Sequence, residues 1–346
     1  MKLIVTIPAL NEAPTIGDVI REIPRRIAGI DAVEVLVIDD GSSDDTVKAA
    51  LEAGADFVVS NRVTRGLANS FKTALQEAIA RGADIIVNTD ADNHYDQSRI
   101  PDLVAPLLAN EADISIGSRL IDELEMKAAN KYGNMIANFL MQRALDLPGV
   151  DVSTGFRAYT AEAAMRLNVL SDHTYTHETL INALDQRLRI ANVPIAARHV
   201  SRPSRLINSV FSHIIRAGTV VLRSFLLYRP MQVYGMLGAI LLAASAVPFV
   251  RFGVLAAMGE GQGHVQSLVI GAVLAFIGGQ LLITGMLATA ISWNRRMVED
   301  VLFRMKSDSF ASAQTERPNL RIVQRAAEEL EYAGRGRHGG STKHAA

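Results

Sequence analysis

The chain has 346 residues, no cysteine, and 35 basic against 36 acidic side chains, so it can form about two or three domains with a large core. Without cysteine it has no disulfide, thiolate metal site or thiol nucleophile. Residues 1–200 carry 19 basic and 28 acidic side chains, and this acidic balance argues against nucleic-acid binding. Residues 201–346 carry 16 basic and 8 acidic side chains, which favours contact with an anionic membrane surface.

Short runs rich in β-branched residues alternate with helical patterns through the first half of the chain. We expect strands at Leu3–Ile7, Val33–Ile38, Asp56–Val59, Ile85–Asn88 and Asp113–Ile116. Helical patterns lie between the first four strands and again at Ile100–Ala109. This alternation is typical of an α/β fold with a mostly parallel sheet and helices on both faces. Such sheets bind ligands beyond the carboxyl ends of their strands.

Acidic and polar residues follow three of these strands. They are Pro8-Ala9-Leu10-Asn11-Glu12, Asp39-Asp40-Gly41-Ser42 and Asp90-Ala91-Asp92. Neither G-x-G-x-x-G nor G-x-x-x-x-G-K-[ST] occurs, which counts against dinucleotide cofactors and P-loop nucleotide hydrolysis. Strand ends lined with Asp suit a ligand with hydroxyls and a diphosphate held through Mg²⁺ or Mn²⁺, because these hard cations prefer carboxylate and phosphate oxygen.

Two uncharged segments in the second half are long enough to cross a membrane. Pro230–Val250 has 21 residues without a charge and Val265–Asn294 has 30. At about 1.5 Å per residue, each reaches the roughly 30 Å of a hydrocarbon core. Buried helices of a soluble domain are the alternative, but they are usually shorter. Basic residues flank the outer ends of both segments, at Arg216, Arg223, Arg229, Arg295, Arg296, Arg304 and Lys306. We therefore expect a catalytic domain and both termini in the cytoplasm.

Helical spacing of apolar residues before the first span predicts an amphipathic helix in the membrane interface, with a soluble core helix as the alternative. Small residues in the second span indicate close helix packing, at Gly271, Gly278, Gly279 and Gly285. The expected organisation is a catalytic domain at 1–205, the interface helix at 206–230, two transmembrane helices at 231–294, and a cytoplasmic tail at 295–346. The end of that tail is expected to be disordered after a short helix at Leu320–Tyr332.

These motifs, in this order at strand ends, resemble those of inverting family 2 glycosyltransferases with the GT-A fold. More narrowly, they resemble the branch that glycosylates polyprenyl phosphates, such as dolichol-phosphate mannose synthases and polyprenyl-phosphate glucosyltransferases. The resemblance covers about residues 1–230 by motif and 230–306 by architecture. It implies a Rossmann-like catalytic domain and metal-dependent transfer of a hexose from a GDP-mannose or UDP-glucose type donor to dolichyl or undecaprenyl phosphate, with inversion.

The resemblance also implies the residues of a donor site. Those around the nucleotide are Pro8, Leu10, Asn11, Glu12 and Ala91. Asp40 is in the position of an acid that contacts the nucleoside, and Asp39 can serve the same purpose. Asp90 and Asp92 match the D-x-D that binds the Mg²⁺ or Mn²⁺ bridging the donor diphosphate, so Asp92 is expected to be essential for catalysis.

Basic residues in family positions are expected to receive the acceptor phosphate. They are Arg119, Lys131 with its neighbour Lys127, Arg202 and Arg205; anchoring of a lipid headgroup is an alternative for the last two. Asp151 is expected to position the sugar, or to act as a base. The floor of the site is assigned to Gly155, Phe156, Arg157 and Glu178, although an ion pair of purely structural value is as good an interpretation for Arg157. His94 and His177 are weaker candidate ligands.

Two other functions remain open at this stage. Transfer to a lipid hydroxyl or a nascent glycan would require Asp151 to act as the base. A non-catalytic membrane scaffold would bind nucleotide sugar without turnover. The Q-x-x-R-W signature of processive polysaccharide synthases is absent, and the single Trp293 is typical of an interface anchor. The expected partners are a nucleotide sugar, a polyprenyl phosphate and the membrane, with a homo-oligomer left open.

Overall fold

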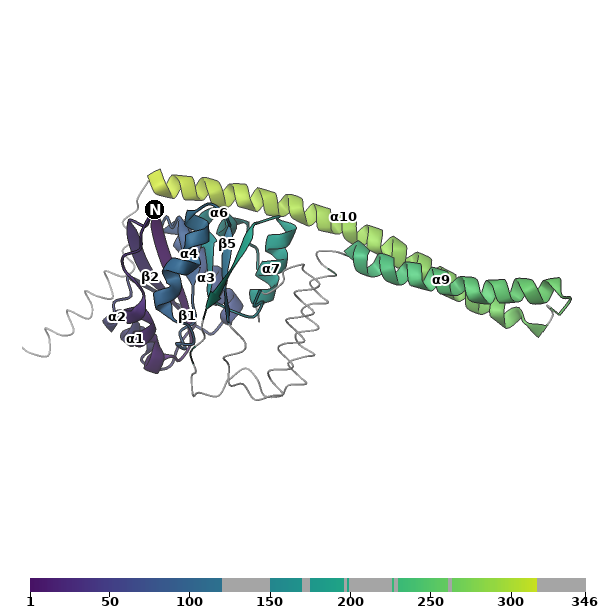
Figure 1. Cartoon of the computed structure of the whole chain (residues 1–346), viewed down its shortest axis with the longest axis horizontal. Helices are drawn as coiled ribbons and strands as arrows, with labels where there is room; N and C mark the ends of the chain where they lie inside the picture. Colours follow the sequence, from purple (N-terminus) through teal and green to yellow (C-terminus); the bar gives the residue numbers. More distant parts are fainter. Residues whose placement is uncertain are drawn as a thin grey trace, which may run out of the picture.

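An α/β domain and a long two-helix hairpin make up the described part of the computed structural model (Figure 1). The described residues are 1–119, 150–169, 175–195, 198, 226, 230–260 and 263–315. The predicted interface helix, apart from residues 226 and 230, and the predicted helix at Leu320–Tyr332 therefore lie outside the described residues.

The α/β domain is built on a seven-stranded mixed sheet in the order β3-β2-β1-β4-β6-β5-β7. The strands are β1 Lys2–Ala9, β2 Ala32–Asp39, β3 Phe57–Ser60, β4 Ile85–Asn88, β5 Ile114–Arg119, β6 Arg157–Thr160 and β7 Ile190–Ile195. Strand β6 runs antiparallel to both of its neighbours, and the other pairs are parallel. The predicted mostly parallel sheet is confirmed. All five expected strands are present, and β6 and β7 are additional.

Alternate strand residues face two separate cores, as a period of two requires. Ile4, Leu36 and Ile86 pack with helices α3, α6 and α7, whereas Leu3, Val35 and Val87 pack with α1, α2 and α4. The helices are α1 Ala13–Glu22, α2 Thr46–Glu52, α3 Leu67–Ala80, the 3₁₀ turn η1 Gln97–Arg99, α4 Ile100–Leu108, α6 Ala161–Arg166 and α7 Thr176–Asp185. Helices thus cover both faces of the sheet, as the sequence predicts. Packing on both faces holds the strands, and with them the residues at the strand ends, in place.

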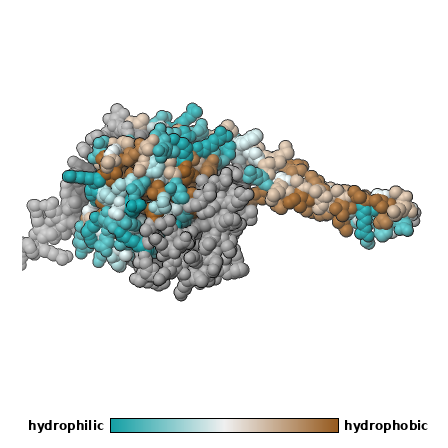
Figure 2. All heavy atoms as spheres, viewed as in Figure 1, coloured by the Kyte–Doolittle hydropathy of each residue, from teal (hydrophilic) through white to brown (hydrophobic). Residues whose placement is uncertain are grey.

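The hairpin consists of α9 (Pro230–Ala257) and α10 (Val265–Thr315). Both are long and apolar enough to cross a membrane, and only 11% and 17% of their most apolar windows are buried by the rest of the chain. Figure 2 shows this apolar surface extending away from the hydrophilic domain. Helices that expose so much apolar surface are not core helices of a soluble domain.

Glycines allow the two hairpin helices to approach closely. A Cβ atom on Gly278 would lie 2.9 Å from the carbonyl oxygen of Gly238, and one on Gly271 would lie 3.2 Å from the ring of Phe249. A Cβ atom on Gly285 would lie 3.1 Å from that of Tyr234. The expected packing is confirmed for these three glycines of α10. It is wrong for Gly279, because, apart from its own stretch of helix, no atom of the described residues lies within 4 Å of a Cβ atom placed there.

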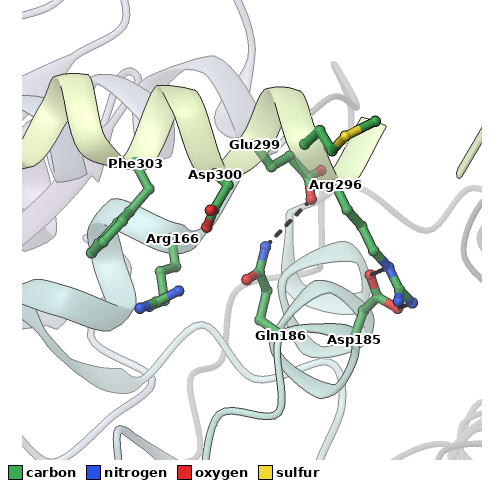
Figure 3. A pocket seen from close by; sticks show the side chains of 8 residues that line it. Arg166, Asp185, Gln186, Arg296, Glu299, Asp300 and Phe303 are labelled. Carbon is green, nitrogen blue, oxygen red and sulfur yellow. Dashed lines mark hydrogen bonds and ion pairs between the residues drawn. The ribbon is translucent and has the colours of Figure 1, made fainter. Parts of the chain in front are cut away.

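Helix α10 does not end at the membrane boundary but continues to Thr315 and docks on the α/β domain (Figure 1). Arg296 forms an ion pair with Asp185 at the end of α7, and Gln186 Nε2 donates to Glu299 Oε2 at 3.3 Å (Figure 3). Residues 295–315, expected as the start of a tail, are therefore a docked helix. The polar residues that suggest a tail are the ones that bind the domain.

A second group of contacts fixes the distal part of this docked helix. Phe303 packs against the core that holds α3 and α6, and the guanidinium of Arg166 lies 4.2 Å from the centre of its ring. Lys306 Nζ donates to the carbonyl oxygen of Met165 at 3.1 Å. A hollow of about 280 Å³ remains between α10 and the helices α6 and α7 (Figure 3). It lies on the helical face of the domain, away from the carboxyl ends of β1, β2 and β4, and polar and aromatic contacts across it hold the helices together.

Candidate active site

The carboxyl ends of β1, β2 and β4 lie side by side and bring the predicted acidic residues to one edge of the sheet. Ala9 at the end of β1 is in register with Asp39 at the end of β2, and Thr6 of β1 is in register with Asn88, the last residue of β4. Asp40 follows β2 directly, and Asp90 follows β4 by two residues. The predicted placement of Asp39, Asp40 and Asp90 at strand ends is therefore confirmed.

The loops after β1 and β2 are bound to each other. The N–H of Asn11 donates to Ser42 Oγ at 2.9 Å, and Asn11 Oδ1 accepts from the N–H of Ser43 at 2.8 Å. Asn11 has φ of +54°, a left-handed conformation that Asn tolerates better than most residues. Pro8 is buried within β1, and Leu10 is exposed beside these loops. The two loops therefore form one unit at the edge where a ligand of this sheet would bind.

Asp39 and Asp40 are both buried but make different contacts. Asp40 uses both carboxylate oxygens, accepting from Asn61 Nδ2 at 2.9 Å and from the N–H groups of Arg65 and Gly66 at 2.9 and 2.8 Å. Asp39 accepts from the N–H of Ser42 through Oδ1 at 3.0 Å. No hydrogen bond to its Oδ2 occurs within the described ranges. Asp40 thus holds the loop before α3, and Asp39 is better placed to contact a ligand.

Asp90 and Asp92 form the acidic centre of the edge. Asp90 is partly buried, whereas Asp92 is more exposed and its Oδ2 lies 2.6 Å from Nδ1 of His94. Burial, and then the charge of Asp92, raise the pKa of Asp90 to about 6. The hydrogen bond to Asp92 raises the pKa of His94.

This pair of carboxylates fits a divalent cation. A bound cation would offset the cost of burying the negative charge of Asp90 next to that of Asp92. Carboxylate oxygen is also the ligand type that Mg²⁺ and Mn²⁺ prefer. In the part of the chain that the structure describes, no three His, Asp or Glu side chains come together as a complete ligand set. Water and a bound phosphate are further oxygen ligands that suit such a cation.

Arg119, at the end of β5, is tied to Asp151. Arg119 Nε donates to Asp151 Oδ2 at 2.6 Å, and Arg119 Nη2 donates to Ser153 Oγ at 2.7 Å. The N–H and hydroxyl of Ser153 both donate to Asp151 Oδ1, at 3.0 and 2.7 Å. Burial alone would raise the pKa of Asp151, but the charge of Arg119 and these hydrogen bonds hold it below the usual range. Asp151 is therefore a poor proton acceptor at neutral pH.

The residues assigned to the floor differ in what they can contact. A Cβ atom on Gly155 would lie 2.7 Å from Asp90 Oδ1, so only glycine fits beside that carboxylate. Phe156 is buried and stacks on Tyr95, with ring centres 5.2 Å apart. Tyr95 was not expected in the site. Glu178 is buried on α7, and His177 Nδ1 lies 3.2 Å from Thr176 Oγ1.

Arg157 lies in the core beneath the site. Its side chain is completely buried and donates to the carbonyl oxygens of Val152, Thr154 and Thr176 at 2.8–3.0 Å and to Thr179 Oγ1 at 2.8 Å. These described partners are carbonyl and hydroxyl oxygens rather than a carboxylate. These contacts favour the structural interpretation of Arg157, and among the described residues they do not include the expected acidic partner.

Four of the predicted acceptor residues lie outside the described residues: Lys127, Lys131, Arg202 and Arg205. Arg119 is the described member of that set. Burial and Asp92 raise the pKa of Asp90, and the nearby charge of Arg119 offsets part of that rise.

Comparison with known proteins gives a consistent result. Residues 4–167 match the family described as Glycosyl transferase family 2. A UDP-N-acetylglucosamine–dolichyl-phosphate N-acetylglucosaminyltransferase of Methanococcus voltae is 27% identical over 214 residues, which cover 55% of this chain and 82% of the relative. An undecaprenyl-phosphate mannosyltransferase of Micrococcus luteus is 29% identical over 210 residues, which cover 56% and 83%.

The fold also matches solved structures. Glucosyl-3-phosphoglycerate synthase from Mycobacterium tuberculosis, crystallised with Mn²⁺, UDP and glucosyl-3-phosphoglycerate, superposes with a TM-score of 0.51 at 26% identity. The match covers 63% of this chain and 79% of that chain. The expected fold class is therefore confirmed.

Proposed function

The chain carries a glycosyl transferase family 2 domain over residues 4–167, and from this premise we propose that it transfers a hexose from a nucleotide sugar to a polyprenyl phosphate at the cytoplasmic face of a membrane, with inversion. The two curated relatives described above are named for transfer to dolichyl and undecaprenyl phosphate. Their names carry different sugars, so the similarity does not select the sugar.

The donor is proposed to bind at the ends of β1, β2 and β4. Asp39 would contact the nucleoside, and the bound loops after β1 and β2 would hold the nucleotide. Asp90 and Asp92 would hold Mg²⁺ or Mn²⁺, which when bound offsets the charge that develops on the leaving diphosphate. A structural neighbour crystallised with Mn²⁺ and UDP supports this assignment.

The hydrogen bonds and the lowered pKa of Asp151 are the observation on which we base the proposal of a phosphate acceptor rather than a hydroxyl acceptor. Both of its oxygens accept hydrogen bonds and its pKa is lowered, so it is poorly suited to remove a proton from a hydroxyl acceptor. A polyprenyl phosphate needs no base, because its oxygen is already an anion near neutral pH. This oxygen would attack the anomeric carbon while the bond to the donor diphosphate breaks and the nucleoside diphosphate leaves with the bonding electrons. Arg119 would orient the acceptor phosphate.

The hairpin supports an acceptor that lies in the membrane. Its helices expose apolar surface over lengths that match a bilayer, and basic residues flank their outer ends. We propose that both termini and the catalytic domain lie in the cytoplasm. The docked part of α10 would then hold the catalytic domain at a fixed height above the membrane.

This holding role predicts a selective effect of Phe303→Ala. Loss of the Phe303 contacts should loosen the domain, because the ring packs on its core and against Arg166. Transfer to a long-chain acceptor in vesicles should fall about tenfold, because small misplacements of reacting groups are costly. Transfer to a short acceptor dispersed in detergent should change little.

Met305→Ala is the matched control for this experiment. Met305 is on the same helix, two residues away, and is 61% exposed, so its removal should affect neither assay. Equal losses with both acceptors in Phe303→Ala would show damage to the fold or the chemistry rather than to placement.

The proposed activity is tested by a radiolabel transfer assay on the full-length protein in detergent. The mixture contains Mn²⁺, a short polyprenyl phosphate, and UDP-glucose, UDP-N-acetylglucosamine or GDP-mannose in parallel. A lipid product that mild acid cleaves, formed from one donor, supports the proposal and identifies the sugar. Transfer only to hydroxyl acceptors, or donor binding with no product from any acceptor, would contradict it.

A further inference from the structure

Tyr95 lies beside the proposed metal-binding carboxylate and has no role in the function described so far. Its side chain is buried, and its ring stacks on Phe156 at an interplanar angle of 13°. Its hydroxyl oxygen accepts from the N–H of Gly155 at 3.1 Å and from Thr154 Oγ1 at 3.2 Å. Stacking and two hydrogen bonds therefore fix the direction of the hydroxyl group.

The Tyr95 hydroxyl and the Asp90 carboxylate both lie beside Gly155: its N–H donates to the hydroxyl at 3.1 Å, and a Cβ atom on it would lie 2.7 Å from Asp90 Oδ1. A phenol has one proton to donate, and its oxygen already accepts from two groups, so this proton is left for the neighbouring carboxylate. Burial raises the pKa of Asp90, and the hydroxyl of Tyr95 opposes that rise. The phenol is neutral, because burial raises its pKa far above the usual range. It can therefore orient the carboxylate without cancelling its charge, which an Arg or Lys in the same place would do.

Gly155 and Tyr175 leave little room around Asp90. A Cβ atom on Gly155 would lie within 3 Å of both carboxylate oxygens and of the Tyr175 hydroxyl. Tyr175 is itself fixed, since its hydroxyl accepts from Asn88 Nδ2 at 2.9 Å and its ring stacks on Phe71. Asp90 thus lies in a narrow slot, whereas Asp92 is half-buried and contacts His94. The two carboxylates are held in different ways.

We propose that Tyr95 is a positioning residue, whose hydroxyl holds Asp90 in the orientation that binds the divalent cation. The inference rests on the proposed function, because it assumes that Asp90 is a metal ligand. Residues that orient a metal ligand typically change metal affinity by about 10-fold to 100-fold when they are removed. Tyr95 would act in this way while itself remaining out of contact with the cation.

The test is Tyr95→Phe, which keeps the ring stacked on Phe156 and removes only the hydroxyl. Mn²⁺ alone is titrated into the full-length protein in detergent, and the free ion is followed by electron paramagnetic resonance. We expect affinity for Mn²⁺ to fall about tenfold. In the transfer assay, the Mn²⁺ concentration for half-maximal rate should rise, with the rate at saturating Mn²⁺ close to that of the unsubstituted protein.

Tyr159→Phe is the matched control. Tyr159 is also fully buried in the domain and packs against Phe71, but Asp90 is not among the groups it contacts. Mn²⁺ binding should be unchanged in this variant. Unchanged Mn²⁺ binding in Tyr95→Phe, together with lost binding in Asp90→Asn, would overturn the role of Tyr95 and leave the metal site intact. Unchanged binding in both would overturn the metal site itself.

Discussion

Replacement of Asp90 with asparagine is expected to abolish sugar transfer and to raise the melting temperature of the metal-free protein. The carboxylate is partly buried beside Asp92, and this environment raises its pKa to about 6. The charged form is therefore unfavourable in the folded protein unless a cation is bound. Asparagine has the same shape without the charge, so it removes this penalty together with the metal ligand.

The size of the stability gain depends on pH. A carboxyl group whose pKa is higher in the folded state than in the unfolded state destabilises the fold as pH rises from its ordinary value of 3.8 to about 6. Above that range the penalty is constant, and it amounts to at most about 3 kcal/mol. The gain in Asp90→Asn should therefore be small at pH values near 4 and full above 6. Thermal unfolding of the full-length protein in detergent with a chelator checks this dependence.

Asp92→Asn is the matched control. Asp92 is more exposed and already contacts His94, so its replacement should abolish transfer without a comparable gain in stability. Proteins commonly give up some stability where function requires like charges to lie close together. A gain in melting temperature over the unsubstituted protein that is the same near pH 4 and above pH 6, or no gain at either pH, would contradict the assignment of strain to this carboxylate. Full activity in either variant would contradict the metal site.

The acidic edge could be predicted because it follows from local rules. Short β-branched runs mark buried strands, and residues after parallel strands meet at one edge. This logic placed Asp39, Asp40 and Asp90 correctly. It could not show whether Asp39 or Asp40 is available to a ligand. The answer depends on which of the two carboxylates accepts hydrogen bonds from the later loop at 61–66. Such a contact joins residues more than twenty positions apart.

The features that were missed depend on tertiary contacts. Strand β6 has four residues and begins with the buried Arg157, so neither its length nor its composition indicates a strand. Tyr95 resembles an ordinary core aromatic, and only the fold brings its hydroxyl to Asp90. The docked part of α10 is expected to be a tail because Arg295, Arg296, Arg304 and Lys306 indicate the cytoplasmic flank of the second span. Phe303 is the apolar residue of this stretch that packs on the domain, and a single apolar residue among charges does not reveal docking.

Replacement of Arg157 is expected to cause the largest loss of stability in the domain. Its guanidinium joins the segment at 152–154 to the start of α7 through four hydrogen bonds and is fully buried. Arg157→Met would fill much of the volume but leave several buried oxygens without donors. Each such group costs about 1–3 kcal/mol, so we expect a total loss of about 3–5 kcal/mol.

Arg157→Lys tests whether charge or geometry is responsible. Lysine keeps the charge but presents one ammonium group in place of the planar fork that reaches three carbonyl oxygens. We expect only partial rescue. Arg99→Met is the control, because Arg99 pairs with Asp102 at the surface and its loss should cost about 1 kcal/mol or less.

Pulse proteolysis of the full-length protein in detergent measures these differences. The single Trp293 lies on α10, outside the α/β domain, so its fluorescence would not report on unfolding of that domain. Digestion of the domain at increasing urea gives its midpoint directly. If Arg157→Met unfolds at the same urea concentration as the unsubstituted protein but no longer binds the donor, Arg157 contacts ligand and the structural interpretation is wrong. A lowered midpoint with donor binding retained in the folded fraction means that Arg157 supports the site from beneath: it fixes the loop that carries Gly155 against α7 and so keeps the slot around Asp90 closed.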